Sequence, residues 1–280
     1  KMRYPQMTRI FIAGSNGFLG KQIANTLTVQ GFDVVQWNQL DITRAISIKK
    51  IPPCDILVNC AGKTNVDWCE THASESFEVN ARGVELLCKE MHARNTRLIH
   101  ISSDYTFFPT NTYAEHKKLA DMFVRNLEGH LIVYVAGLYG LHRDGKKCLP
   151  EWIIEKMRAG EPLSIVRDVE GSHTLVGDIA SYFPRFISDG LEGEIACVGE
   201  GVHSKFDVAQ AVAQTFGFEA SLVTPVEQAQ LLEKGIWKAR RPTRVNLWEK
   251  PVKKYACKGI TDGLIQLKIE MDENKYHSQS

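Results

Sequence analysis

The sequence has no paired cysteines, no excess of charge of either sign and no long apolar run. Its seven cysteines are scattered singly, with no CxxC pair, which argues against a zinc site and suits reduced cytoplasmic thiols. The formal net charge is +1, so nothing favours nucleic acid as a partner. No run approaches the ~20 apolar residues of a membrane helix, and no secretory-signal pattern opens the chain. We therefore expect a cytoplasmic protein that binds neither nucleic acid nor a membrane and holds no metal.

Apolar runs typical of buried strands alternate with helical patterns through the first half of the chain. The expected strands are residues 9–13, 33–37, 55–60, 97–102 and 131–135, and the expected helices are residues 17–30, 74–92 and 113–126. This alternation, with short connections, predicts an α/β protein with a Rossmann-like, doubly wound parallel sheet. After about residue 140 the pattern loosens. We expect one domain over residues 7–145, with late sheet elements around 163–200, and an interleaved smaller C-terminal lobe over 146–280.

A glycine-rich stretch, Gly14-x-x-Gly17-x-x-Gly20, lies where the first expected strand meets the first expected helix. In a dinucleotide site the first glycine permits a tight turn, the second lets the backbone approach the pyrophosphate, and the third lets the helix pack close to the strand. The helix N-terminus adds free N–H groups for phosphate. The stretch predicts an NAD(P) site in the first domain, with these cofactor-binding residues: Gly14, Asn16, Gly17, Phe18, Leu19 and Gly20.

The end of the second expected strand bears on the choice between NADPH and NADH. An acidic residue there would bind the ribose 2′-hydroxyl of NADH, but the strand ends Gln36-Trp37-Asn38. No arginine stands there to hold a 2′-phosphate either. The missing acid favours NADPH, with NADH as the alternative.

Tyr113 and Lys117 stand four residues apart at the start of an expected helix, so they share one face. A lysine ammonium beside a tyrosine favours the phenolate and lowers the tyrosine pKa. Such a tyrosine can protonate a carbonyl oxygen as hydride reaches the carbon. A hydroxyl from Ser103 or Ser102, at the end of the preceding strand, would bind the same oxygen.

Several stretches in order resemble an extended short-chain dehydrogenase/reductase, and more narrowly the dTDP-4-dehydrorhamnose reductase family. Besides the glycine loop they are Leu40-Asp41-Ile42-Thr43, Val58-Asn59-Cys60-Ala61-Gly62-Lys63-Thr64-Asn65-Val66-Asp67-Trp68-Cys69-Glu70, Val79-Asn80-Ala81, Ile101-Ser102-Ser103-Asp104-Tyr105-Thr106-Phe107, Tyr113-x-x-x-Lys117 and Arg241-Pro242. Together they span most of residues 9–247.

The resemblance implies an enzyme that reduces the 4-keto group of a nucleotide-linked 6-deoxyhexose with NADPH or NADH. By position, the implied catalytic residues are Ser103, Tyr113 and Lys117. The implied cofactor contacts beyond the glycine loop are Asp41, Ile42, Cys60, Ala61, Gly62, Lys63, Tyr113 and Lys117. The implied substrate contacts are Val66, Ser103, Asp104, Tyr105 and Arg241. The oligomeric state is not specified, and a homodimer is the commonest closed form.

Three departures from the family pattern fall on the substrate side. Only nine residues, 104–112, separate Ser103 from Tyr113, where the family has a longer loop. A tryptophan that would line the sugar site appears as Gly137, and the small residues that follow the catalytic tyrosine appear as Ala114-Glu115-His116. Two alternatives therefore stay open: an NAD-retaining nucleotide-sugar epimerase, and a non-catalytic regulatory subunit of the same fold.

Overall fold

The computed structural model describes residues 8–142 and 147–277. Seven parallel strands form the main sheet, in the order β13-β10-β5-β4-β3-β1-β2. Their bounds are β1 Arg9–Ala13, β2 Asp33–Gln36, β3 Ile56–Asn59, β4 Arg97–Ser103, β5 Leu131–Val135, β10 Gly193–Gly199 and β13 Lys253–Cys257. The doubly wound parallel sheet predicted from the sequence is confirmed.

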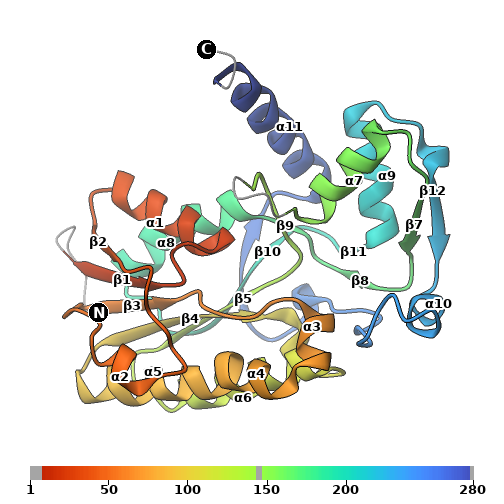
Figure 1. Ribbon diagram of the computed structural model, residues 1–280. Helices are drawn as coiled ribbons and strands as arrows, with labels where there is room; N and C mark the ends of the chain where they lie inside the picture. The colour runs from red at the N-terminus through yellow and green to blue at the C-terminus, as the bar shows by residue number, and fades with distance from the viewer. Residues whose placement is uncertain (1–7, 143–146, 278–280) are drawn as a thin grey trace.

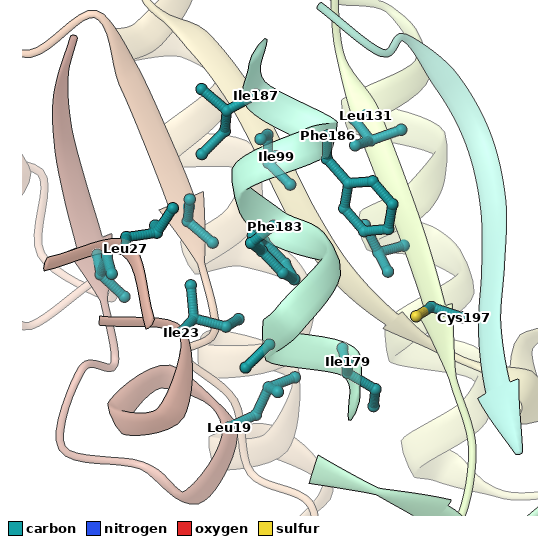
Figure 2. Close-up of a cluster of buried hydrophobic side chains, with 14 of the residues drawn as sticks. Leu19, Ile23, Leu27, Ile99, Leu131, Ile179, Phe183, Phe186, Ile187 and Cys197 are labelled. Carbon is teal, nitrogen blue, oxygen red and sulfur yellow. The ribbon is translucent and has the colours of Figure 1, made fainter. Parts of the chain in front are cut away.

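Helices cover both faces of this sheet (Figure 1). On one face lie α1 (Phe18–Val29) and α8 (Val176–Ser188). Their apolar side chains pack against one set of alternating strand residues, as Figure 2 shows for Phe183 and Phe186 beside Ile99 and Leu131. Burying each such side chain contributes roughly 1.5–3 kcal/mol, so this cluster fixes where α1 lies on the sheet.

The opposite face carries α2 (Ala45–Ile48) and a long helical segment, followed by α6 (Thr112–Arg125). The long segment is the helix expected over residues 74–92. It consists of α4 (Ala73–Phe77), a π-helical turn (Glu78–Arg82) and α5 (Gly83–Ala93). The other strand side chains, among them Leu57, Leu98 and Ile132, pack against this layer.

A smaller lobe, whose elements alternate in sequence with the last strands of the sheet, lies beside the sheet (Figure 1) and has its own apolar core. Its elements are α7 (Leu149–Arg158), α9 (Lys205–Phe216), α10 (Gln228–Glu233), α11 (Ile260–His277), and the pair β7 (Leu163–Val166) with β12 (Val223–Val226). The remaining short elements are α3 (Val66–Thr71), β6 (Leu138–Tyr139) with β9 (Thr174–Leu175), β8 (Glu170–Gly171) with β11 (His203–Ser204), and 3-10 turns at Asp104–Phe107, Ala220–Leu222 and Leu247–Glu249. None of the described helices is long and apolar enough to span a bilayer.

Of the two strands expected between residues 160 and 200, only one belongs to the main sheet. Strand β7 lies outside the main sheet and pairs with β12, whereas β10 joins the main sheet beside β5. Strand β13 pairs with β10 and forms the edge of the sheet, although its sequence contains no apolar run that would predict a strand. The late sheet elements therefore come from β10 and β13, and α8 crosses back over the sheet between β7 and β10.

Candidate active site

The order in which strands are added to the sheet reverses at β1, because β2 is added on one side of it and β3 on the other. Strand β1 pairs with β2 on one side and with β3 on the other. The carboxyl ends of β1 and β3 therefore flank a topological switch point, where open α/β sheets bind their ligands. The glycine loop leaves β1 at this point, and residues 60–63 leave β3 there.

The glycine loop is packed too closely for side chains at two of its positions. Gly14 has φ +77°, and a Cβ built on it would lie 2.8 Å from the backbone nitrogen of Ala61. A Cβ on Gly20 would lie 2.3 Å from the carbonyl oxygen of Gly14. The Gly17 N–H donates to that same oxygen at 2.9 Å. The loop is thus a tight turn pressed against β3 on one side and against α1 on the other.

The N-terminus of α1 is left without an internal cap. Gly17 is its N-cap, no side chain caps it, and no acidic residue lies in its first turn. The free N–H groups and the positive end of the helix dipole suit a phosphate. Asn16, Lys21 and His142 help to line a pocket at this end.

The side chains of Phe18 and Leu19, both predicted to bind the cofactor, lie in different surroundings. Phe18 stacks on the imidazole of His142, with ring centroids 3.6 Å apart. The side chain of Leu19 is buried in the core beneath α8, so only its backbone can face a ligand.

Asp41 and Ile42, the residues predicted beside the adenine, lie in the loop after β2. Asp41 is exposed, and its carboxylate accepts hydrogen bonds from the N–H and the hydroxyl of Thr43. Ile42 is buried against Gly83 at the start of α5, where a Cβ would meet it at 2.9 Å. Its side chain belongs to the core, and only Asp41 offers a polar group at this position.

The segment after β3 is held in place by Asn80, a residue of the π-helical turn. The Asn80 side chain accepts from the Lys63 N–H and donates to the Lys63 carbonyl, both at 2.9 Å. This clamp fixes the backbone of Cys60, Ala61, Gly62 and Lys63 at the sheet edge. The Val-Asn-Ala motif was the only sign of Asn80 in the sequence, and its position in a π turn was not predicted.

Ser103, Tyr113 and Lys117 come together despite the short connection. Ser103 ends β4, and Tyr113 begins α6, whose N-cap Asn111 accepts from the Ala114 N–H. Ser103 lies close enough to Tyr113 for its side chain to influence the tyrosine pKa. The 3-10 turn at Asp104–Phe107 folds the nine-residue connection compactly enough to allow this.

Burial shifts the pKa values of Tyr113 and Lys117 in opposite directions. It raises the pKa of Tyr113, and the neighbouring Ser103 side chain only partly opposes that rise. Burial also lowers the pKa of Lys117 to about 8, against the opposing effect of the Asp121 carboxylate. The lysine nitrogen donates to the Ile101 carbonyl at 2.7 Å and lies 3.0 Å from Nε2 of His100. The expected lowering of the tyrosine pKa by the lysine is therefore not seen in the protein alone.

Asp104 and Tyr105, predicted to line the sugar pocket, are largely buried beside Ser103. Asp104 accepts from the Ser103 hydroxyl at 3.0 Å, and burial raises its pKa to about 7 despite that bond. Burial also raises the pKa of Tyr105. Gly171 of β8 lies beside the other Asp104 oxygen, so β8 faces Asp104 and the neighbouring Ser103 here.

Arg241 already has an anionic partner within the chain. Its two terminal nitrogens bind the two oxygens of Asp67, each at 2.7 Å, and its guanidinium stacks 4.0 Å from the Trp237 ring centroid. Asp67 sits in α3 next to the partly buried Val66. The sequence did not predict this pairing of Asp67, and the ion pair links α3 to the C-terminal lobe.

Gly137, which replaces a tryptophan of the family pattern, has no room for a side chain. It has φ +49°, and a Cβ would lie 2.6 Å from the Ser172 carbonyl oxygen and 2.9 Å from Nδ1 of His173. The segment before β9 fills the space, and burial lowers the pKa of His173 to about 4. A neutral imidazole therefore lies against Gly137.

One group of potential metal ligands occurs within the described ranges: His142, Cys148 and Glu151. The Glu151 carboxylate accepts from Nδ1 and the N–H of His142 and from the N–H of Cys148. These bonds place the Glu151 carboxylate in the capping box at the start of α7, whose N-cap is Cys148.

Comparisons with known proteins agree with this geometry. A family model described as the RmlD substrate binding domain matches residues 7–261. The dTDP-4-dehydrorhamnose reductase of Mycolicibacterium smegmatis is 29% identical over 237 residues, which cover 78% of this chain and 72% of that protein. The dTDP-4-keto-6-deoxy-D-glucose reductase of Streptomyces niveus is 27% identical, covering 78% and 83%. Among solved structures, dTDP-4-dehydrorhamnose reductase from Bacillus anthracis in complex with NADP has a TM-score of 0.83 at 26% identity, covering 94% of this chain and 99% of that one.

Proposed function

Since the chain belongs to the RmlD family of NAD(P)-dependent reductases, which act on dTDP-4-keto-6-deoxysugars, we propose that it uses NADPH and that Ser103, Tyr113 and Lys117 carry its proton chemistry. The observation that carries this proposal is the placement of Tyr113, near the start of α6, beside Ser103 at the carboxyl end of β4, with Lys117 one turn further along the same helix. Ligands bind at this edge of an open parallel sheet.

The residues of the first domain fit a dinucleotide. The glycine loop forms a tight turn at the sheet edge with no room for side chains at Gly14 and Gly20, and the uncapped start of α1 suits the pyrophosphate. Asn16, Phe18 and the segment of residues 60–63 would hold the rest of the molecule. When bound, the nicotinamide supplies the hydride.

The side chains then have separate roles toward the sugar. Tyr113 donates its proton to the carbonyl oxygen that becomes the 4-hydroxyl, and Ser103 orients that oxygen by a hydrogen bond. The Lys117 ammonium stabilises the phenolate that Tyr113 leaves behind. Val66, Asp104 and Tyr105 would line the sugar pocket, with Arg241 supporting it through Asp67.

The preference for NADPH has two supports. Strand β2 ends at Gln36 without a carboxylate to bind a ribose 2′-hydroxyl. The similar Bacillus anthracis enzyme was solved with NADP. Titration of the purified protein with NADPH and NADH, followed by nucleotide fluorescence, should give the lower Kd for NADPH.

The decisive experiment combines the protein with NADPH and dTDP-4-dehydrorhamnose. We expect one NADPH to be consumed for each sugar reduced. An epimerase would turn the sugar over without net oxidation, and a regulatory subunit would bind nucleotide without turnover. Either result, with NADPH binding intact, would overturn the proposed reduction.

A further inference from the structure

A chain of buried polar side chains lies directly behind Lys117. Its members are Asn59 at the end of β3, His100 in β4, and Asp121 one turn after the lysine in α6. Each of the three is at most 1% exposed. Polar groups buried this deeply need hydrogen-bond partners within the chain, so the direction of each bond can be worked out.

The orientation of Asn59 follows from its bond to the glycine-loop side of the sheet. Its oxygen accepts from the Ala61 N–H at 3.1 Å. Its amide nitrogen therefore faces Nδ1 of His100, also at 3.1 Å. An amide nitrogen only donates, so Nδ1 of the imidazole must be the acceptor.

That direction decides where the imidazole carries its proton. Burial and the nearby Lys117 hold the pKa of His100 well below its usual value, so the ring is neutral and has one N–H. With Nδ1 accepting, the proton sits on Nε2. Nε2 lies 3.0 Å from the Lys117 nitrogen. Only a neutral amine has a lone pair to accept this N–H, because an ammonium would present hydrogens to it.

A second arrangement would suit the ammonium instead. If the Asn59 amide turned over, its oxygen would accept from an Nδ1–H, and Nε2 could accept from the Lys117 ammonium. The Ala61 N–H would then face an NH₂ group and lose its acceptor. The two arrangements therefore compete, and the bond to Ala61 favours the first.

We propose that Asn59 and His100 are positioning residues that set the charge of Lys117 through the tautomer of the buried imidazole. With the Asn59 amide held by Ala61, the Nε2–H form opposes the ammonium, and the Nδ1–H form supports it. The effect on turnover rests on the proposed function, in which the Lys117 ammonium acts on Tyr113. The tautomer itself does not.

The other groups that face Lys117 also shift its pKa. The carboxylate of Asp121 and the thiol of Cys60, which follows β3, both raise the lysine pKa, while burial lowers it more strongly, to about 8. Oδ2 of Asp121 accepts from Ser102, but its Oδ1 has no hydrogen-bond partner in the described part of the chain and lies 3.9 Å from Nε2 of His100. His100 is thus the group in direct contact whose influence depends on a proton position.

The variant Asn59→Asp tests the proposal with almost no change of shape. One carboxylate oxygen can keep the Ala61 N–H, and the other can only accept, which forces the imidazole proton to Nδ1. We expect the alkaline limb of the pH profile of kcat/KM to move upward by about one pH unit, because Nε2 now accepts from the ammonium. The KM for NADPH should change less than kcat.

The new carboxylate could also act on Lys117 directly through space, so the same change is made in a His100→Phe background. The proposal requires the shift to disappear without the imidazole. A shift of equal size with and without His100 would overturn it. Ile99→Val, in the same strand and fully buried on the other face, controls for loss of core packing.

Nitrogen-15 spectra of labelled histidine provide a readout that needs neither activity nor the phenylalanine variant. In the wild type one buried ring should show its proton on Nε2, and in Asn59→Asp the same ring should show it on Nδ1. An Nδ1–H ring in both proteins would refute the proposal even if the reductase activity is established. The predicted exchange of tautomers would support it even if no reduction is found.

Discussion

Substitution of Gly20 by alanine should separate the packing of the glycine loop from ordinary helix propensity. In α1 the new Cβ would lie 2.3 Å from the Gly14 carbonyl oxygen and 2.9 Å from its carbon, both backbone atoms. Non-bonded carbon contacts settle near 3.5–4.0 Å, so the loop or the helix must move by about 1 Å. Overpacking of this kind costs roughly 1–3 kcal/mol, which corresponds to a fall in Tm of roughly 2–5 °C in a chain of this size.

The same displacement should weaken NADPH binding, because it moves the backbone groups that would face the pyrophosphate. A loss of about 1.4 kcal/mol raises Kd tenfold. Thermal unfolding and fluorescence titration measure the two effects on the same preparation.

Gly177→Ala is the matched control, since Gly177 is the second residue of α8 and a Cβ there meets nothing within 4 Å. Alanine should stabilise that helix by up to about 1 kcal/mol and leave NADPH binding unchanged. If Gly20→Ala kept the wild-type Tm and Kd, the inference that this loop has no room for a methyl group would be wrong.

Three further substitutions test the site. Tyr113→Phe keeps the ring and removes the proton, so kcat should fall roughly 10²–10⁴-fold with NADPH affinity unchanged; normal turnover would exclude Tyr113 as donor. Burial raises the pKa of Asp104 to about 7, so the folded state holds a proton that the unfolded state releases. Stability in urea should therefore decline between about pH 4 and 7, by at most on the order of 4 kcal/mol, and decline less in Asp104→Asn; equal slopes would contradict this. Arg241→Lys loses the paired bonds to Asp67 and should cost roughly 1–2 kcal/mol in chemical unfolding, whereas Arg167→Lys, in an exposed pair, should cost little; equal losses would refute the distinction.

The first half of the fold could be predicted because its signals are local. An apolar run, three glycines and a helical pattern follow one another within residues 9–30, and each refers only to its neighbours. The late part of the sheet lacks such signals. Strand β13 reads Lys-Lys-Tyr-Ala-Cys, and its exposed positions carry a polar and a small side chain, so no apolar run marks it. It is recognisable as a strand only through its pairing with β10.

The residues of the candidate site also fall into those with local sequence signals and those brought together only by the fold. Tyr113 and Lys117 stand on one helix at a known spacing, so their common face followed from the sequence. The contact between Asp67 and Arg241 joins residues 174 positions apart. The buried bonds from Asn59 through His100 to Lys117 cross three separate elements. Nothing local distinguished His100 from an ordinary core histidine, because its role depends on which donors and acceptors the sheet brings against it.

The π-helical turn in the middle of the long helix has a consequence for how this chain can change over evolution. A π turn holds one more residue than an α turn, so the helix after it is rotated by about 100° relative to an unbroken α-helix. Asn80 lies within the turn, and the buried stripe of α5 begins just after it at Gly83 and Val84. Deleting a single residue from the turn would therefore turn either the Asn80 clamp or the α5 stripe away from the sheet. Loss of this one position should be tolerated far less than a deletion in an exposed loop, although no residue in the turn is itself proposed to react.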